Sequence, residues 1–284
     1  MDAFIGEDIQ FLPRPEGRIA YTVEGSGPLV VAVPGMGDLR SSYREIVPPL
    51  VAAGYRVAVT DLRGHGASDT TFHTHGDVAT GEDIIALIDE LGGPAVVLGN
   101  SMGGSAAAWA AAERADAVIG LVLYDPFLRE PARPAVARIA MSLLFRLALA
   151  PLWGGAFWAG YYRSINRGTH AAWLEEHVSD LRGSLREPGR LRSLRDLALQ
   201  LDHSVVEERL GEVDAPFRVF FGAEDPDFSD PSAEAAWIDS IGGETQLVPD
   251  AGHYPHAQRP DITVPATLEF LGRIRTGHQA WAHA

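Results

Sequence analysis

The most informative stretch of this chain is Val96-Val97-Leu98-Gly99-Asn100-Ser101-Met102-Gly103-Gly104, which the Ala-rich run 105–112 follows at once. An apolar run with β-branched residues ends in a Gly-x-Ser-x-Gly turn, and the turn leads directly into a helix-forming segment. This order of strand, turn and helix makes Ser101 the candidate nucleophile. Glycine is expected at 99 and 103 because side chains there would collide with the neighbouring strand and helix around a strained serine.

The composition is that of an ordinary soluble globular protein with a large core. The chain has 284 residues, of which 46% are hydrophobic and 21% charged. Its 38 acidic and 23 basic residues give a formal charge of −15, so we expect neither nucleic acid nor an anionic lipid surface as a partner. The absence of cysteine excludes disulfides, thiolate metal sites and a cysteine nucleophile.

Neither a signal peptide nor a membrane span is indicated. The first eight residues are acidic and no apolar core follows them, so we expect a cytoplasmic protein. The apolar stretch 139–162 is interrupted by Arg146, Pro151 and Gly154-Gly155. These interruptions come before the roughly 20 apolar residues that a spanning helix needs.

Apolar runs alternate with helical patterns along most of the chain. Strands are predicted at 9–12, 18–24, 29–33, 56–60, 95–98, 118–124, 217–221 and 245–248. Helices are predicted from Ser41 or Ser42 to Ala53, from Asp77 or Thr80 to Leu91, after Ser101, over 232–241, and from Asp261 or Thr263 to Ile274. The first two strands form an antiparallel pair, and the alternation that follows predicts an α/β protein with a mostly parallel sheet.

The segment 126–212 differs from the rest because it contains helical patterns only. Its net charge is +2, whereas the remainder of the chain carries −17. We interpret it as a helical cap inserted into a core formed by 1–125 and 213–284. Its aromatic side chains either line an apolar substrate pocket or pack the cap on the sheet: Phe145, Trp153, Phe157, Trp158, Tyr161 and Tyr162.

Four motifs follow successive predicted strands, and together they resemble the α/β-hydrolase superfamily. They are Asp61 to Ser68, Gly99 to Gly103, Gly222-Ala223-Glu224-Asp225-Pro226 and Ala251-Gly252-His253. The resemblance covers nearly all of the chain outside the cap. It implies a mostly parallel eight-stranded sheet flanked by helices, an inserted helical cap and a serine-nucleophile, esterase-like enzyme. We interpret the loop 61–68 as scaffold, tied down by its own polar side chains.

The chemistry of a serine nucleophile requires a histidine base and a carboxylate that fixes the tautomer of the histidine. Ser101, Asp225 and His253 occur in the order that this fold uses. Asp125 and Asp227 are rivals for the acid, and His256 is a rival for the base. His73 and His75 lack further ligands at a suitable spacing, so we predict no metal, and we predict no cofactor.

The oxyanion hole needs two backbone N–H groups. One is expected from Met102, and the resemblance implies Met36 as the other. The loop before Met36 begins Pro34-Gly35, where the superfamily usually has His-Gly. The residues expected to contact substrate are Gly35, Asn100, Phe145, Trp153, Trp158, Tyr162 and Tyr254.

The leading hypothesis is hydrolysis of an apolar, small-molecule carboxylic ester through an acyl-enzyme. A second is hydrolysis of carbon–carbon bonds in ring-cleavage diketones, because Gly-Asn-Ser-Met-Gly-Gly is similar to the elbow of that group. That group usually has Trp where this chain has Tyr254, and its Gly-rich oxyanion loop is missing here. A cofactor-free perhydrolase and a ligand-binding receptor with a hydrolase fold are further alternatives. The sequence does not indicate an oligomeric state.

Overall fold

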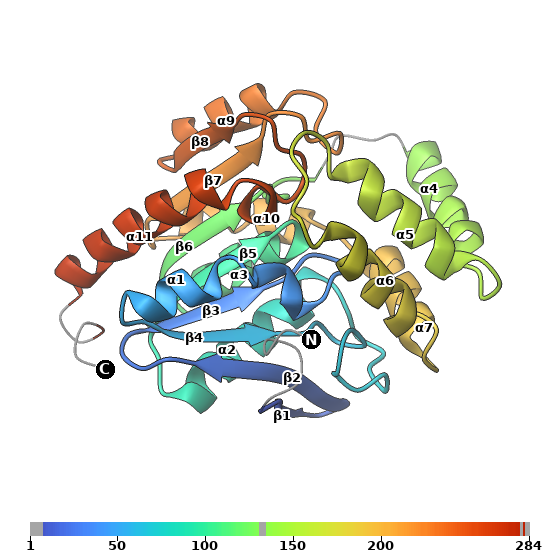
Figure 1. Ribbon diagram of the computed structural model, residues 1–284, viewed down its shortest axis with the longest axis horizontal. Helices are drawn as coiled ribbons and strands as arrows, with labels where there is room; N and C mark the ends of the chain where they lie inside the picture. Colours follow the sequence, from blue (N-terminus) through green and yellow to red (C-terminus); the bar gives the residue numbers. More distant parts are fainter. Residues whose placement is uncertain (1–7, 131–134, 279–280, 282–284) are drawn as a thin grey trace.

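The computed structural model describes residues 8–130, 135–278 and 281, and it contains one eight-stranded sheet (Figure 1). The strands are β1 Gln10–Arg14, β2 Gly17–Glu24, β3 Leu29–Val33, β4 Arg56–Thr60, β5 Ala95–Asn100, β6 Val118–Tyr124, β7 Phe217–Gly222 and β8 Glu244–Val248. Their order across the sheet is β1-β2-β4-β3-β5-β6-β7-β8. Strand β2 runs antiparallel to β1 and β4, and all other pairs are parallel. The predicted fold class is confirmed.

Helices cover both faces of the sheet, which is why every residue of β3, β5 and β6 is buried. On one face, α2 Asp77–Leu91, α3 Met102–Glu113 and α9 Pro231–Ser240 pack on the sheet. On the other, α1 Val47–Ala52 and α11 Pro260–Gly277 do so. The continuous apolar runs in the sequence are therefore strands that bury both of their faces.

Every described element between β6 and β7 is helical. These elements are α4 Ala135–Ala148, α5 Gly154–Ile165, α6 Leu174–Ser184, α7 Arg190–Gln200, α8 Ser204–Glu207 and the 3-10 turn η2 Leu210–Glu212. We call residues 135–212 the helical insertion. Figure 1 shows α5, α6 and α7 beyond the carboxyl ends of β3 and β4. The boundaries 126 and 212 of an independent cap stay a prediction.

One helix prediction needs correction, and one short helix was not predicted. The helix expected from Ser41 or Ser42 to Ala53 is divided into the 3-10 turn η1 Arg40–Tyr43 and α1, and neither serine caps α1. The Pro48-Pro49 pair at the start of α1 explains the division. Proline favours the first turn of a helix and disfavours helical backbone in the residue before it, so a new helix begins here. A short helix that was not predicted, α10 Pro255–Gln258, precedes α11. None of the described helices is long and apolar enough to cross a membrane.

Candidate active site

Ser101 lies at the sharp turn between β5 and α3. Its backbone has φ 54° and ψ −127°, a strained conformation for a residue with a side chain. A Cβ on Gly99 would come within 2.6 Å of the Gly103 carbonyl oxygen, and one on Gly103 within 2.5 Å of the Val33 and Pro34 oxygens. Both glycines are therefore required by close approach of the backbone, as the sequence predicts.

Asp225 and His253 follow β7 and β8, and they contact each other directly. His253 Nδ1 donates to Asp225 Oδ2 at 2.6 Å, and both side chains are buried. Asp225 Oδ1 accepts the N–H of Asp227 at 2.9 Å, which fixes the carboxylate plane. Asp227 itself is 3.8 Å from His253 Nδ1. Of these two acids, Asp225 is the one hydrogen-bonded to the imidazole.

The electrostatics of this pair favour the imidazolium. Burial opposes the charge, but the Asp225 carboxylate and its hydrogen bond raise the pKa of His253 from 6.5 to about 9. Burial also opposes the charge on Asp225, yet the charge and hydrogen bond of His253 lower the Asp225 pKa below 3.8. A proton taken up by His253 is therefore stabilised by a neighbouring negative charge.

Asp125, the rival acid after β6, has a different environment. Its side chain is fully buried, and its oxygens accept the N–H of Gly222 at 3.0 and 3.2 Å. Burial, followed by the charge of Asp225, raises the pKa of Asp125 well above 3.8. Burial and the charge of Asp225 thus favour the neutral form of Asp125, whereas His253 favours the charged form of Asp225.

His256, the rival base, lies away from Asp225 in an aromatic cluster. Its ring stacks on Tyr43 at 4.9 Å and lies 4.8 Å from Tyr124. Within the described part of the chain neither ring nitrogen has a hydrogen-bond partner. Burial lowers the pKa of His256 to about 3, which keeps the ring neutral.

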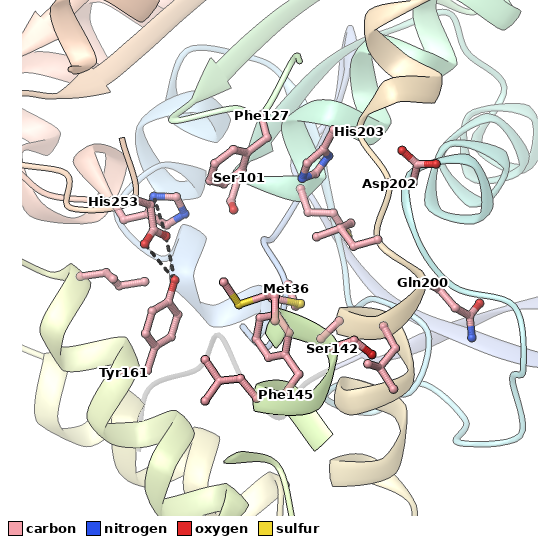
Figure 2. A pocket seen from close by; sticks show the side chains of 18 of the residues that line it. Met36, Ser101, Phe127, Ser142, Phe145, Tyr161, Gln200, Asp202, His203 and His253 are labelled. Atoms are coloured by element: carbon pink, nitrogen blue, oxygen red, sulfur yellow. Dashed lines mark hydrogen bonds and ion pairs between the residues drawn. The ribbon is translucent and has the colours of Figure 1, made fainter. Parts of the chain in front are cut away.

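Ser101 and His253 face one cavity of about 830 Å³ beneath the helical insertion, a volume typical of small-molecule sites (Figure 2). No hydrogen bond joins the Ser101 hydroxyl to His253 in the portion of the chain that the structure describes. Such contacts are often loose without substrate. Besides Ser101 and His253, the candidate oxyanion-hole and pocket residues that line this cavity are Met36, Met102, Phe145, Phe157, Trp158, Tyr161 and Tyr254.

Four residues expected to contact substrate lie outside the cavity lining. A Cβ on Gly35 would come within 3.0 Å of Ser101 Cβ, so Gly35 lies against the elbow. Asn100 Nδ2 donates to the carbonyl oxygens of Tyr124 and His253, both at 3.0 Å, and so joins the end of β6 to the segment after β8. Trp153 is 51% exposed, and its indole donates to a backbone oxygen of α4. Tyr162 is buried and contacts Asp38, with 3.4 Å between hydroxyl and carboxylate.

The cavity has a polar side that the sequence did not indicate. Glu130, Asp202, Asp227 and His203 contribute to its lining. Figure 2 shows Asp202 and His203 across the cavity from His253 and Tyr161. Among the described lining residues there is no arginine, and the chain contains no lysine. The lining is therefore apolar with a negative side.

His203 illustrates why pattern analysis missed this side. Its Nδ1 lies 2.9 Å from Asp77 Oδ2, and its ring stacks on Phe127 at 5.2 Å. The partners come from α2, the segment after β6 and the segment before α8, so no local spacing connects them. Only the folded chain reveals the pairing.

The loop 61–68 acts as scaffold, as predicted. Asp61 accepts the N–H groups of Arg40 at 3.1 Å and Ala67 at 2.9 Å, and it forms an ion pair with the Arg40 guanidinium. Ser68 Oγ accepts the N–H of Ala20 at 2.9 Å. The loop also presents His65 to the segment after β3, where its Nε2 accepts the N–H of Gly37 at 3.1 Å.

The described residues contain one group of three possible metal ligands, Asp125, Asp225 and His253, with ligand atoms within 4.8 Å of one another. Asp225 accepts a hydrogen bond from His253, and Asp125 accepts one from the Gly222 N–H. This geometry gives no reason to assign a metal, and the absence of metal and cofactor stays a prediction.

Known proteins are similar to this chain in sequence and in fold. The AB hydrolase superfamily protein YfhM of Bacillus subtilis (strain 168) is 25% identical over 268 residues, which cover 89% of this chain and 93% of that protein. The 2-hydroxy-6-oxononadienedioate/2-hydroxy-6-oxononatrienedioate hydrolase of Comamonas testosteroni is 26% identical over 262 residues, covering 90% and 88%. The solved structure of a thermophilic esterase from Thermogutta terrifontis has the same fold, with a TM-score of 0.74, 24% identity and coverage of 94% and 99%.

The family model for alpha/beta hydrolases matches residues 30–266, a range that runs from β3 into α11 and includes the elbow, the acid and the histidine. This chain belongs to the alpha/beta hydrolase family.

Proposed function

We propose that this chain is a serine hydrolase of uncharged or cationic carboxylic esters that acts through an acyl-enzyme. The observation that carries the proposal is the 2.6 Å bond between His253 Nδ1 and Asp225, facing the same cavity as a serine held at positive φ. This arrangement leaves His253 Nε2 as the nitrogen available to the Ser101 hydroxyl.

In the first half-reaction Ser101 Oγ attacks the ester carbonyl carbon while its proton passes to His253 Nε2. The carbonyl oxygen becomes negative and is stabilised by the N–H groups of Met36 and Met102. The tetrahedral intermediate collapses when the carbon–oxygen bond to the alcohol breaks and His253 returns the proton to the leaving oxygen. In the second half-reaction water attacks the acyl carbon while His253 takes its proton. The bond between that carbon and Ser101 Oγ then breaks, His253 returns the proton to Oγ, and the carboxylic acid leaves.

The charge of the cavity favours esters over dianionic diketones. Glu130, Asp202 and Asp227 contribute carboxylates to the lining, and the described lining residues include no arginine or lysine that would pair with a substrate carboxylate away from His253. A like charge roughly 10 Å away costs about 1.7 kcal/mol at an effective dielectric constant of about 20. The apolar lining, including Phe145 and Trp158, supports an acyl or alcohol group of moderate size.

The test compares two p-nitrophenyl esters of equal length, a neutral butyrate and an anionic hemisuccinate. We expect kcat/KM to be at least tenfold higher for the butyrate, and the ratio should shrink in a Glu130→Gln/Asp202→Asn variant. The Ser101→Ala variant should lose on the order of a million-fold in kcat.

Further assays on the same protein distinguish the alternatives. Consumption of a ring-cleavage diketone with every ester untouched would establish the carbon–carbon hydrolase instead. Faster acyl transfer to peroxide than to water would establish the perhydrolase. Binding of esters without turnover would establish the receptor.

A further inference from the structure

The loop Pro34 to Asp38, which follows β3, contains the proposed oxyanion donor Met36, and we call it the 34–38 loop. It departs from the usual His-Gly start. The structure holds it by a set of buried contacts with the scaffold loop and with two helices of the insertion. Those contacts involve the two residues directly after Met36.

Gly37 is bound on both sides of its peptide. Its N–H donates to His65 Nε2 at 3.1 Å, and its carbonyl oxygen accepts the indole N–H of Trp158 on α5 at 2.9 Å. A Cβ on Gly37 would lie 2.3 Å from the Trp158 ring, so only glycine permits this approach. Gly37, which follows the proposed donor Met36, is therefore held by His65 of the core and Trp158 of the helical insertion.

Asp38 is bound by α6. Its Oδ1 accepts His177 Nε2 at 2.6 Å, and both side chains are 0% exposed. With Nε2 as the donor, His177 Nδ1 is free to accept the Ser41 hydroxyl, which lies 3.2 Å away. The carboxylate also accepts the N–H of Leu39 at 2.8 Å. A buried carboxylate that loses such a partner is costly, so this pair fixes where the 34–38 loop lies.

We propose that the helical insertion holds the oxyanion donor in place: His177 and Trp158 are positioning residues that orient the Met36 N–H through Asp38 and Gly37. The proposal rests on the proposed function, because it assumes that Met36 stabilises an oxyanion. His177 is absent from the cavity lining and does not contact substrate there. It acts by holding the peptide that does, so the insertion is part of the catalytic geometry as well as a cover over the cavity.

A misplaced oxyanion donor lowers kcat rather than affinity for the ground state. Loss of one such donor costs about 10²- to 10³-fold in kcat, and a loosened donor should cost part of that. We expect His177→Leu to lower kcat by about 10- to 100-fold with KM changed less than threefold. His177→Gln keeps an amide donor toward Asp38 and should recover much of the loss. Trp158→Phe removes the indole N–H contact together with one ring of a side chain that lines the cavity, and it should lower kcat by a smaller factor.

The matched control is Val178→Ala, which loses buried packing on the same helix without touching a polar contact of the loop. It should leave kcat unchanged. A second readout is the inhibition constant of phenylboronic acid, whose tetrahedral adduct on Ser101 places an oxygen at the oxyanion position. That constant should rise in parallel with the fall in kcat for His177→Leu and stay constant for Val178→Ala.

The outcomes separate this inference from the proposed function. If the parent hydrolyses esters in a Ser101-dependent way and folded His177→Leu keeps its kcat and boronate affinity, the positioning role is refuted. An equal loss in Val178→Ala would refute it too, since loosening of α6 would then suffice. If His177→Leu fails to fold, His177→Gln and Trp158→Phe carry the test through kcat and the phenylboronic acid constant, because Trp158 also lines the cavity and its replacement changes KM. Unchanged values of both quantities in both variants would refute the positioning role. Activity that persists in Ser101→Ala would instead overturn the proposed function.

Discussion

Replacement of Asp225 by asparagine removes the carboxylate that holds His253 while keeping the shape of the side chain. The pKa of His253 is raised to about 9 from 6.5, burial opposing the rise and Asp225 causing it. That rise corresponds to about 3 kcal/mol in favour of the imidazolium. His253 becomes an imidazolium in the transition state, so losing this stabilisation costs on the order of 10²-fold in kcat/KM.

A second effect adds to the first. The asparagine amide can donate to His253 Nδ1, which leaves the proton on Nε2, where it faces the serine instead of accepting from it. The wrong tautomer can bring the loss to about 10⁴-fold. We therefore expect Asp225→Asn to lose between about 10² and 10⁴ in kcat/KM on p-nitrophenyl butyrate.

The pH profile gives the same variant a second signature. His253 must be unprotonated to act as a base, and its raised pKa means that kcat/KM of the parent climbs with pH toward a midpoint near 9. In Asp225→Asn the midpoint should fall to 6.5 or below. Rates measured from pH 5 to 10 would show the shift.

Asp125→Asn is the matched control, because Asp125 is equally buried and follows the neighbouring strand. Burial and the charge of Asp225 raise the pKa of Asp125, which favours the neutral carboxyl, and asparagine resembles that form. We expect kcat/KM within tenfold of the parent and an unchanged midpoint. The reasoning is refuted if Asp125→Asn loses as much as we assign to Asp225→Asn while the latter stays active.

Two further predictions concern stability. Burial lowers the pKa of His65 to about 4 and the pKa of His256 to about 3, against 6.5 in the unfolded chain. The unfolded chain therefore takes up these protons first as pH falls below 6.5, and the folded state loses stability. At pH 5 each of the two histidines lowers the free energy of unfolding by about 2 kcal/mol. His256→Phe should therefore reduce the difference in urea unfolding free energy between pH 8 and pH 5. An unaltered difference would contradict the role assigned to His256. Gly103→Ala places a Cβ 2.5 Å from two backbone oxygens and should cost about 3 kcal/mol of unfolding free energy. Gly272→Ala, with open space around it, should cost nothing, so equal losses would contradict the steric argument.

The local sequence pattern was sufficient to predict the strands of the sheet and the sharp turn at Ser101. The strands β3, β4 and β6 have the predicted bounds, and β3 and β6 are continuous apolar runs because both of their faces are buried. The order of Ser101, Asp225 and His253 is likewise visible in the sequence, since each residue follows its own strand. The structure adds the 2.6 Å bond that distinguishes Asp225 from Asp125 and Asp227.

The rest depends on tertiary contacts that no local pattern encodes. Apolar spacing identifies the helices of the insertion but does not tell which aromatic faces the cavity, so Phe145 and Trp158 line it while Tyr162 binds Asp38. The Asp38–His177 pair joins residues separated by 139 positions, and no spacing rule connects them. The carboxylates on the negative side of the cavity are also brought together only by tertiary contacts, so the sequence did not predict them.

The central claim, that Ser101 becomes acylated, can be measured directly by mass spectrometry. The protein is mixed with p-nitrophenyl butyrate, quenched in acid within milliseconds and digested. We expect a butyryl group on the peptide that contains Ser101, absent from Ser101→Ala and formed far more slowly in His253→Ala. The chain has no cysteine that could be acylated instead. Ester turnover without an adduct on Ser101, or with the adduct on another residue, would contradict the account.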